Sequence, residues 1–93
     1  MDSSIKKLKK RVNIHNELGL HARPAALIAQ IAQEATSKVW IIRNEEKVDA
    51  SSIIDILTLA CLKGTEVTLQ IDDPVDETVL ERIVALFHEG FGE

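Results

Sequence analysis

The chain is poor in cysteine and in aromatic residues. It has one cysteine, Cys61, no tyrosine, one tryptophan and two phenylalanines among its 93 residues. A single cysteine excludes an internal disulfide framework and any zinc site that needs several cysteines. No apolar run approaches the roughly 20 residues of a membrane-spanning helix, so we expect no membrane insertion. The charged stretch near the first residue is not followed by the apolar segment of a secretory signal, and we therefore expect a cytoplasmic protein.

Charge is unevenly distributed along the chain. Residues 1–11 hold five basic residues and one acidic residue, whereas the remainder holds 6 basic and 14 acidic residues. We expect residues 1–8 to form a mobile basic extension and residues 9–93 to form a single domain. A basic arm could touch nucleic acid or a membrane surface. An acidic body with so few aromatic residues is a poor nucleic-acid binder, however, and we expect no nucleic-acid partner.

The hydrophobic pattern predicts four strands and three helices. Val67, Leu69 and Ile71 alternate with polar residues, as in a half-buried strand, and Val39–Ile42 is rich in β-favouring residues. Strands are expected at 8–15, 38–43, 47–50 and 66–71. Helices are expected over residues 22–35, from Ser51 or Ser52 to Lys63, and from Asp73-Pro74 onward. Gly64 then lies just beyond the end of the second helix. The order β-α-β-β-α-β-α predicts an α+β fold with two layers.

Alternation also makes a prediction about the sheet face that no helix covers. If Val39 and Ile41 point toward the helices, Trp40 and Ile42 point toward the open face. An exposed tryptophan beside an exposed isoleucine is a candidate contact surface. The alternative is that long neighbouring side chains cover both residues.

The segment from Gly19 to Ala26, Gly-Leu-His-Ala-Arg-Pro-Ala-Ala, predicts a junction between a strand and a helix. Pro24 is tolerated in a first helical turn, which places His21 at or beside the N-cap. The backbone N–H groups of Ala22 and Arg23 are then free, and a helix N-terminus with free N–H groups binds anions such as phosphate. His21 and Arg23 are therefore candidate phosphate-handling residues.

A plainer interpretation also applies to this junction. A histidine near a helix start is often only exposed or weakly capping, and Arg23 could be an ordinary surface charge. The context favours function, because Gly19 permits a tight turn, Pro24 fixes the helix start and the small side chain of Ala22 leaves the imidazole accessible.

The segment Gly19–Ala25 resembles the active-site segment of HPr, the histidine-containing phosphocarrier family of the bacterial phosphoenolpyruvate-dependent sugar phosphotransferase system. The resemblance continues through residues 44–54 and 59–69 and covers about residues 9–90. It implies an open-faced β-sandwich, with a four-stranded antiparallel sheet and three helices on one face. It also implies that Nδ1 of His21 is phosphorylated by enzyme I, that sugar-specific IIA domains are the acceptors, and that the protein is a carrier without a cofactor or metal.

The chemistry of the junction agrees with a carrier. Imidazole is largely uncharged near neutral pH, and a helix N-terminus disfavours its cationic form. After transfer, Arg23 and the N–H groups of Ala22 and Arg23 can receive the phosphoryl oxygens. Phosphoryl transfer depends largely on positioning and charge neutralisation, so a small protein can supply one half of a composite site.

The resemblance assigns further residues. Ser52 matches the serine that a regulatory HPr kinase modifies in some branches of the family, although a serine at a helix start is often only a cap. Leu20, Ile53, Ile54 and Leu57 match the partner-binding hydrophobic patch, although a short amphipathic helix must bury some of its apolar residues. The acidic Asp55 and the absence of Lys and Arg from Ala25 to Ala35 leave Arg23 as the main basic group near His21.

Other functions remain open on the sequence. A regulatory HPr-like protein, nitrogen-related or acting in catabolite control, would use the same residues for signalling. A phosphatase with His21 as nucleophile would need a general acid, for which the sequence offers no candidate nearby, and a binding module would not use His21. We expect His15 and His88 to be structural or solvated, and Cys61 to be a buried thiol.

Overall fold

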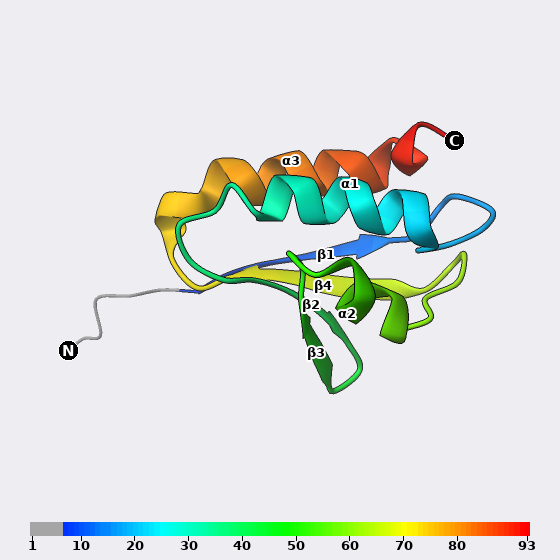
Figure 1. The fold of residues 1–93 in the computed structure, drawn as a ribbon, viewed down its shortest axis with the longest axis horizontal. Helices are drawn as coiled ribbons and strands as arrows, with labels where there is room; N and C mark the ends of the chain where they lie inside the picture. The colour runs from blue at the N-terminus through cyan, green and yellow to red at the C-terminus, as the bar shows by residue number, and fades with distance from the viewer. Residues whose placement is uncertain (1–6) are drawn as a thin grey trace.

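The computed structural model describes residues 7–93 (Figure 1). The strands are β1 (Leu8–Asn13), β2 (Val39–Arg43), β3 (Glu46–Asp49) and β4 (Glu66–Ile71). The helices are α1 (Ala22–Ala32), α2 (Ile53–Thr58) and α3 (Glu77–His88), with short 3₁₀ turns η1 (Pro74–Asp76) and η2 (Gly90–Gly92). Among residues 7–93, no helix has both the length and the apolar character needed to span a lipid bilayer.

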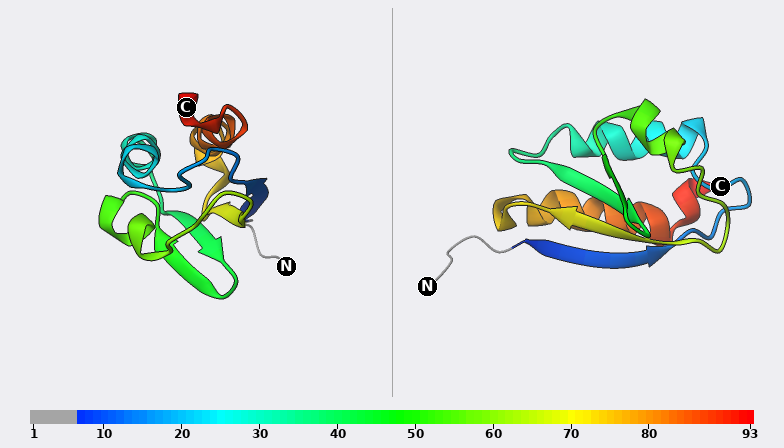
Figure 2. Two further views of the ribbon diagram at one scale, coloured as in Figure 1. Left: turned by 90° about the vertical axis from the view of Figure 1, so that its right-hand side faces the viewer. Right: turned by 90° about the horizontal axis from the view of Figure 1, so that it is seen from below.

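The four strands form one antiparallel sheet in the order β1-β4-β2-β3. Helices α1 and α3 lie side by side on one face of this sheet, and α2 packs beside α1 and against β3 (Figures 1 and 2). On the other face, the described residues 7–93 place no helix (Figure 2). The predicted fold class, an α+β open-faced sandwich, is therefore confirmed.

The core lies between the sheet and the helices. Alternate residues of the central strand β4, namely Val67, Leu69 and Ile71, are buried, as their spacing predicts. Ile28 of α1 and Phe87 of α3 pack on this layer from the helix side and are fully buried. This layer fixes where α1 begins relative to the sheet, and so where the segment around His21 lies.

Trp40 is half-buried on the open face of the sheet. Its indole Nε1 donates a hydrogen bond of 3.1 Å to Asp72, and the ammonium of Lys47 lies 4.6 Å from the ring centroid. Val39 and Ile41 are buried beneath the helices, and Ile42 is half-buried on the open face. The alternation is thus as predicted, and long neighbours cover the tryptophan.

Two predicted helix ends are wrong. Helix α1 ends at Ala32, with Gln33 as its C-cap, and not at Ala35. Helix α2 ends at Thr58, five residues before Lys63, so Gly64 does not terminate it. The chain leaves α2 through Ala60, which has a positive φ of 50°, because Leu59 and Cys61 on either side turn into the core. Gly64 instead donates its N–H to Ile14 O at 2.8 Å in the turn before β4.

The expected basic extension falls largely on residues 1–6, which lie outside the described residues. Leu8, the last residue assigned to it, belongs to β1 and pairs with Ile71 of β4.

The start of α3 is joined to the chain segment that follows α1. Asp73 accepts a hydrogen bond from Val75 N–H at 3.0 Å, as its predicted capping role requires, but the first turn is 3₁₀. Asp76 is 4% exposed and accepts three hydrogen bonds: two from the N–H and hydroxyl of Thr36, both 2.8 Å, and one from the N–H of Ser37 at 2.9 Å. Burial raises the pKa of the Asp76 carboxyl, but these hydrogen bonds lower it by more.

Replacing Asp76 with alanine is expected to reduce the free energy of unfolding by about 2–4 kcal/mol at pH 7, because three hydrogen-bond donors of Thr36 and Ser37 lose their charged acceptor. The pKa of Asp76 is lower in the folded protein than its ordinary value of 3.8. Its stabilisation is therefore complete above that value and is lost as the pH falls through the folded-state pKa. Urea unfolding of both proteins at pH 7 and at pH 2 measures this difference.

Glu81→Ala, at an exposed position of α3, is the control and should change the free energy of unfolding by less than about 0.5 kcal/mol. A loss in Asp76→Ala that is the same at both pH values would contradict the role of the ionised carboxylate.

Candidate functional site

The loop between β1 and α1 presents His21 as the N-cap of α1. His21 has extended backbone angles, φ −85° and ψ −168°. Just before it, the N–H of Leu20 donates to Cys61 O at 3.0 Å, and Gly19 has a φ of +67°. A Cβ on Gly19 would overlap the carbonyl oxygen of Cys61, so this close approach of two backbones requires glycine. The loop is thereby fastened to the segment that follows α2.

Helix α1 begins as the sequence predicts. Pro24 is buried in the first turn, and Ala25 N–H donates to His21 O at 3.0 Å as the first helical hydrogen bond. The N–H groups of Ala22 and Arg23 find no acceptor among residues 7–93. No acidic residue lies in the first turn. These free N–H groups and the positive end of the helix dipole have the geometry from which anion binding is predicted.

The carboxylate of Glu93 is bound beside His21. It accepts hydrogen bonds from Asn16 Nδ2 at 3.0 Å and from Arg23 Nη1 at 3.2 Å, and it lies 2.9 Å from Nε2 of His21. The hydrogen bond from Asn16 lowers the pKa of Glu93 most strongly, burial acts in the opposite direction, and His21 and Arg23 lower it further. The net effect is a pKa below the ordinary value, so Glu93 is an anion at neutral pH.

Sequence reasoning missed Asn16 and Glu93. Asn16 is 5% exposed, its Nδ2 also donates to Gly19 O at 2.7 Å, and its Oδ1 has no partner among the described residues. Its place before the turn residue Gly19 was a local signal that could have been used. Glu93 lies 72 residues from His21 along the chain, and no local pattern indicates their contact.

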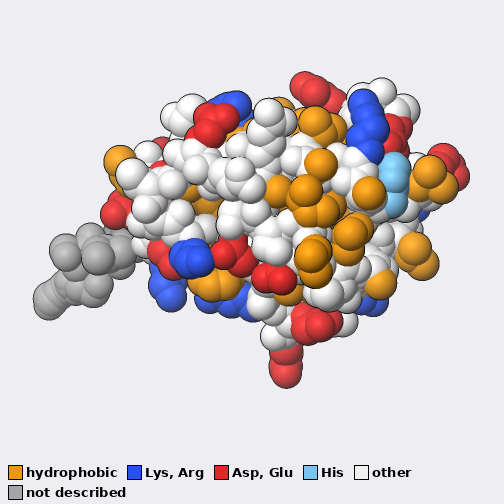
Figure 3. Space-filling model, in the orientation of Figure 1, with side chains coloured by type: hydrophobic (Ala, Val, Ile, Leu, Met, Phe, Trp, Pro, Cys, Tyr) orange, Lys and Arg blue, Asp and Glu red, His pale blue; other side chains and the backbone are white. Residues whose placement is uncertain are grey.

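Hydrophobic side chains are exposed next to this end of α1. Figure 3 shows them gathered over α2 and the beginning of α1. The exposed fraction is 74% for Ile54, 41% for Ile53 and 39% for Leu57, whereas Ile56 is fully buried. The expected division of α2 between core and surface is therefore present. We call Ile53, Ile54, Leu57 and the 70% exposed Leu62 the α2 patch.

The family resemblance implies that Leu20 contacts partner proteins. Leu20 is too buried to make such a contact directly. Its exposed fraction is only 3%, because its N–H is bonded to the Cys61 carbonyl and its side chain joins the core. Leu18, two residues earlier, is 68% exposed.

Ser52 is the N-cap of α2. Its side-chain oxygen accepts a hydrogen bond of 3.2 Å from the N–H of Asp55, which is the plain capping role. Ser51 points elsewhere, since its hydroxyl donates to Asp49 at 2.6 Å.

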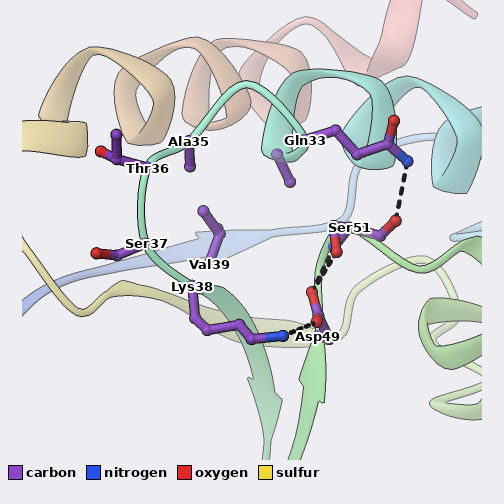
Figure 4. A pocket seen from close by; sticks show the side chains of 9 residues that line it. Gln33, Ala35, Thr36, Ser37, Lys38, Val39, Asp49 and Ser51 are labelled. Atoms are coloured by element: carbon purple, nitrogen blue, oxygen red, sulfur yellow. Dashed lines mark hydrogen bonds and ion pairs between the residues drawn. The ribbon is translucent and has the colours of Figure 1, made fainter.

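A pocket of about 350 Å³ lies near Ser51, at the opposite end of α1 from His21 (Figure 4). Its polar groups bond to one another: Lys38 to Asp49 at 2.8 Å, and Gln33 to the Ser51 carbonyl at 3.1 Å. The pocket brings together none of the predicted site residues.

The remaining candidate groups lie apart from the site or inside the core. His15 and His88 are exposed. Cys61 is 3% exposed, and burial raises the pKa of its thiol, as expected of a structural cysteine.

Comparison with known proteins agrees with this geometry. Residues 8–89 match the family model described as the PTS HPr component phosphorylation site. The chain is 40% identical to the phosphocarrier protein HPr of Cupriavidus necator, over 92% of this chain and 97% of that protein.

Solved structures show the same similarity. HPr of Thermoanaerobacter tengcongensis superposes with a TM-score of 0.86 and 36% identity, covering 92% of this chain and 97% of that one. The catabolite repression protein Crh of Bacillus subtilis superposes with a TM-score of 0.70 and 38% identity, covering 88% and 94%. The chain therefore belongs to the HPr family of the phosphotransferase system, whose members are phosphocarriers rather than enzymes.

Proposed function

We propose that His21 accepts a phosphoryl group from phosphorylated enzyme I and passes it to the IIA domains of sugar permeases. The observation that carries this proposal is the position of His21 at the N-cap of α1, with free N–H groups on Ala22 and Arg23 directly after it. The imidazole side chain is 34% exposed, so a partner protein can reach it.

The transfer needs little from this chain beyond position and charge. In the loading step, a ring nitrogen of neutral His21 forms a bond to phosphorus as the bond from phosphorus to the donor's leaving atom breaks, and the electrons of that bond stay with the donor. The free N–H groups and the Arg23 guanidinium receive the phosphoryl oxygens. Because the site is open to solvent, this stabilisation stays moderate, and the group can leave for the next acceptor.

The α2 patch is the proposed docking surface for these partners. Its residues are exposed and adjoin the end of α1 that carries His21 (Figure 3). Exposed clusters of large apolar side chains are typical of protein contact sites. Within α1, no acidic or basic residue lies in the first or last turn apart from Arg23, so we expect apolar contact to contribute more than charge.

A regulatory role is the second candidate. It is favoured by the similarity to Crh, a protein named for catabolite repression, at 38% identity. In that role the phosphorylation state of the chain would carry a signal and little sugar flux. The same His21 would be used, so the two roles differ in their acceptor proteins.

Ser52 is the proposed second phosphorylation site, modified by an HPr kinase. Its hydroxyl is half-buried and engaged as a cap, but a phosphate there would still meet the N-terminal N–H groups of α2. Its negative charge would stand beside Asp55 and next to the exposed Ile53. Phosphorylation of Ser52 is thus expected to weaken docking at the α2 patch.

Incubation with enzyme I and phosphoenolpyruvate is expected to label the protein with acid-labile phosphate, and His21→Ala should abolish the label. His15→Ala and His88→Ala remove exposed histidines and serve as controls that keep full labelling. Labelling that survives in His21→Ala, or is absent from the wild type, would reject the proposed carrier role.

Ile54→Ser is expected to raise the KM for phosphorylated enzyme I about tenfold, since burying an isoleucine side chain is worth about 1.5–3 kcal/mol. Val75→Ser is the matched control, because Val75 is 69% exposed but lies in η1, whose Asp76 bonds to Thr36 in the segment that follows α1, away from His21. Steady-state phosphotransfer kinetics measure both. Equal KM values for the two variants would show that the α2 patch is not the docking surface.

An HPr kinase with ATP is expected to label the wild type and Ser51→Ala, but not Ser52→Ala. Ser51 is a close control because it precedes Ser52 directly and has its hydroxyl bonded to Asp49. Loss of the cap should also reduce the free energy of unfolding of Ser52→Ala by about 1 kcal/mol. The assay is phosphopeptide mapping, and a wild type that takes up no label would exclude Ser52 as a site for that kinase.

A further inference from the structure

We infer that Glu93 is a positioning residue for the transfer reaction: its carboxylate holds the Nε2–H tautomer of His21 and so leaves Nδ1 as the nucleophile. This inference rests on the proposed function of His21. It assigns a role to a side chain far from His21 in sequence, at 2.9 Å from its ring.

The tautomer follows from the chemistry of the two groups. An ionised carboxylate can only accept hydrogen bonds, so the atom facing it at 2.9 Å must carry the proton. That atom is Nε2. A neutral imidazole has one N–H, and its other nitrogen, Nδ1, therefore carries the lone pair that can attack phosphorus. Among residues 7–93, no group donates a hydrogen bond to Nδ1 that would occupy this lone pair.

The Glu93 carboxylate is itself held in place. Asn16, which is buried, binds its Oε1, and Arg23 binds the same Oε2 that faces His21. The backbone leading to it is also fastened. Arg23 Nη1 donates to Phe91 O at 3.0 Å, and Phe91 is 2% exposed and packs edge-on against Phe87 with ring centroids 4.9 Å apart. Phe91 keeps a positive φ of 58°, which directs the chain back toward His21.

The same contact assists the transfer itself. When Nδ1 forms its bond to phosphorus, the ring still carries the Nε2 proton and becomes positively charged. The carboxylate of Glu93 is already hydrogen-bonded to that proton and compensates the new charge without moving. Among the described residues Arg23 uses only Nη1 for Glu93 and Phe91, so its other N–H groups remain for the phosphoryl oxygens.

The test combines NMR spectroscopy with kinetics on the full chain. In ¹⁵N-labelled wild type, at a pH where the His21 ring is neutral, two-bond ¹H–¹⁵N spectra should show the Nε2–H tautomer alone, with a slowly exchanging Nε2 proton. In Glu93→Ala this proton should exchange too fast to detect, and a fraction of the Nδ1–H tautomer should appear.

The kinetic measurement follows phosphotransfer from enzyme I. In Glu93→Ala the kcat should fall about threefold, as expected for the loss of one partly exposed ion pair, with KM unchanged. Glu93→Gln keeps an acceptor oxygen and should lie between the two.

Glu34→Gln is the matched control, because Glu34 also forms a surface ion pair, at 2.6 Å to Arg82, but lies near the far end of α1. It should leave the His21 spectrum and kcat unchanged. The inference is overturned if Glu93→Ala shows the wild-type tautomer, proton exchange and kcat. Failure of the proposed function would appear differently, as a wild type that enzyme I does not label, while the spectra would still report the contact between Glu93 and His21.

Discussion

His21 is held in place by backbone hydrogen bonds between two loops at the same end of the molecule. Leu20 N–H donates to Cys61 O, and the neighbouring pairs from Ile14 N–H to Thr65 O at 3.0 Å and from Gly64 N–H to Ile14 O continue the connection. Only a glycine at position 19 allows the loop to approach this closely. The start of α1, the free N–H groups and the partly exposed ring all depend on this contact.

The site is therefore a helix N-terminus with free N–H groups and a histidine as its N-cap. Three side chains from the loop before α1 and its first turn converge on the Glu93 carboxylate: the amide of Asn16, the guanidinium of Arg23 and the ring of His21. A carboxylate and a phosphoryl group share charge sign and oxygen acceptors. The contacts with Glu93 thus show that this end of the molecule can neutralise a negative group. The neighbouring α2 patch gives a large apolar surface to the same end of the molecule.

Much of this could be predicted from the sequence, because the signals are local. The alternation in β4, the placement of Pro24 and the Ser52 cap depend on residues a few positions apart, and the structure has each feature. The end of α2 could not be found in this way, since Ala60 adopts a positive φ only because the core takes up its two neighbours. The burial of Leu20 depends on its contact with the Cys61 segment. The contact between Glu93 and His21 depends on the packing of Phe91 against α3, which no nearby pattern encodes.

The most direct test of the account is to identify the nitrogen that carries the phosphoryl group. ¹⁵N-labelled protein would be phosphorylated with enzyme I and phosphoenolpyruvate, and the ¹⁵N–³¹P coupling would be assigned to one ring atom. The account predicts coupling to Nδ1 of His21, with Nε2 still protonated and facing Glu93. Coupling to Nε2, or to an atom of any other residue, would contradict it.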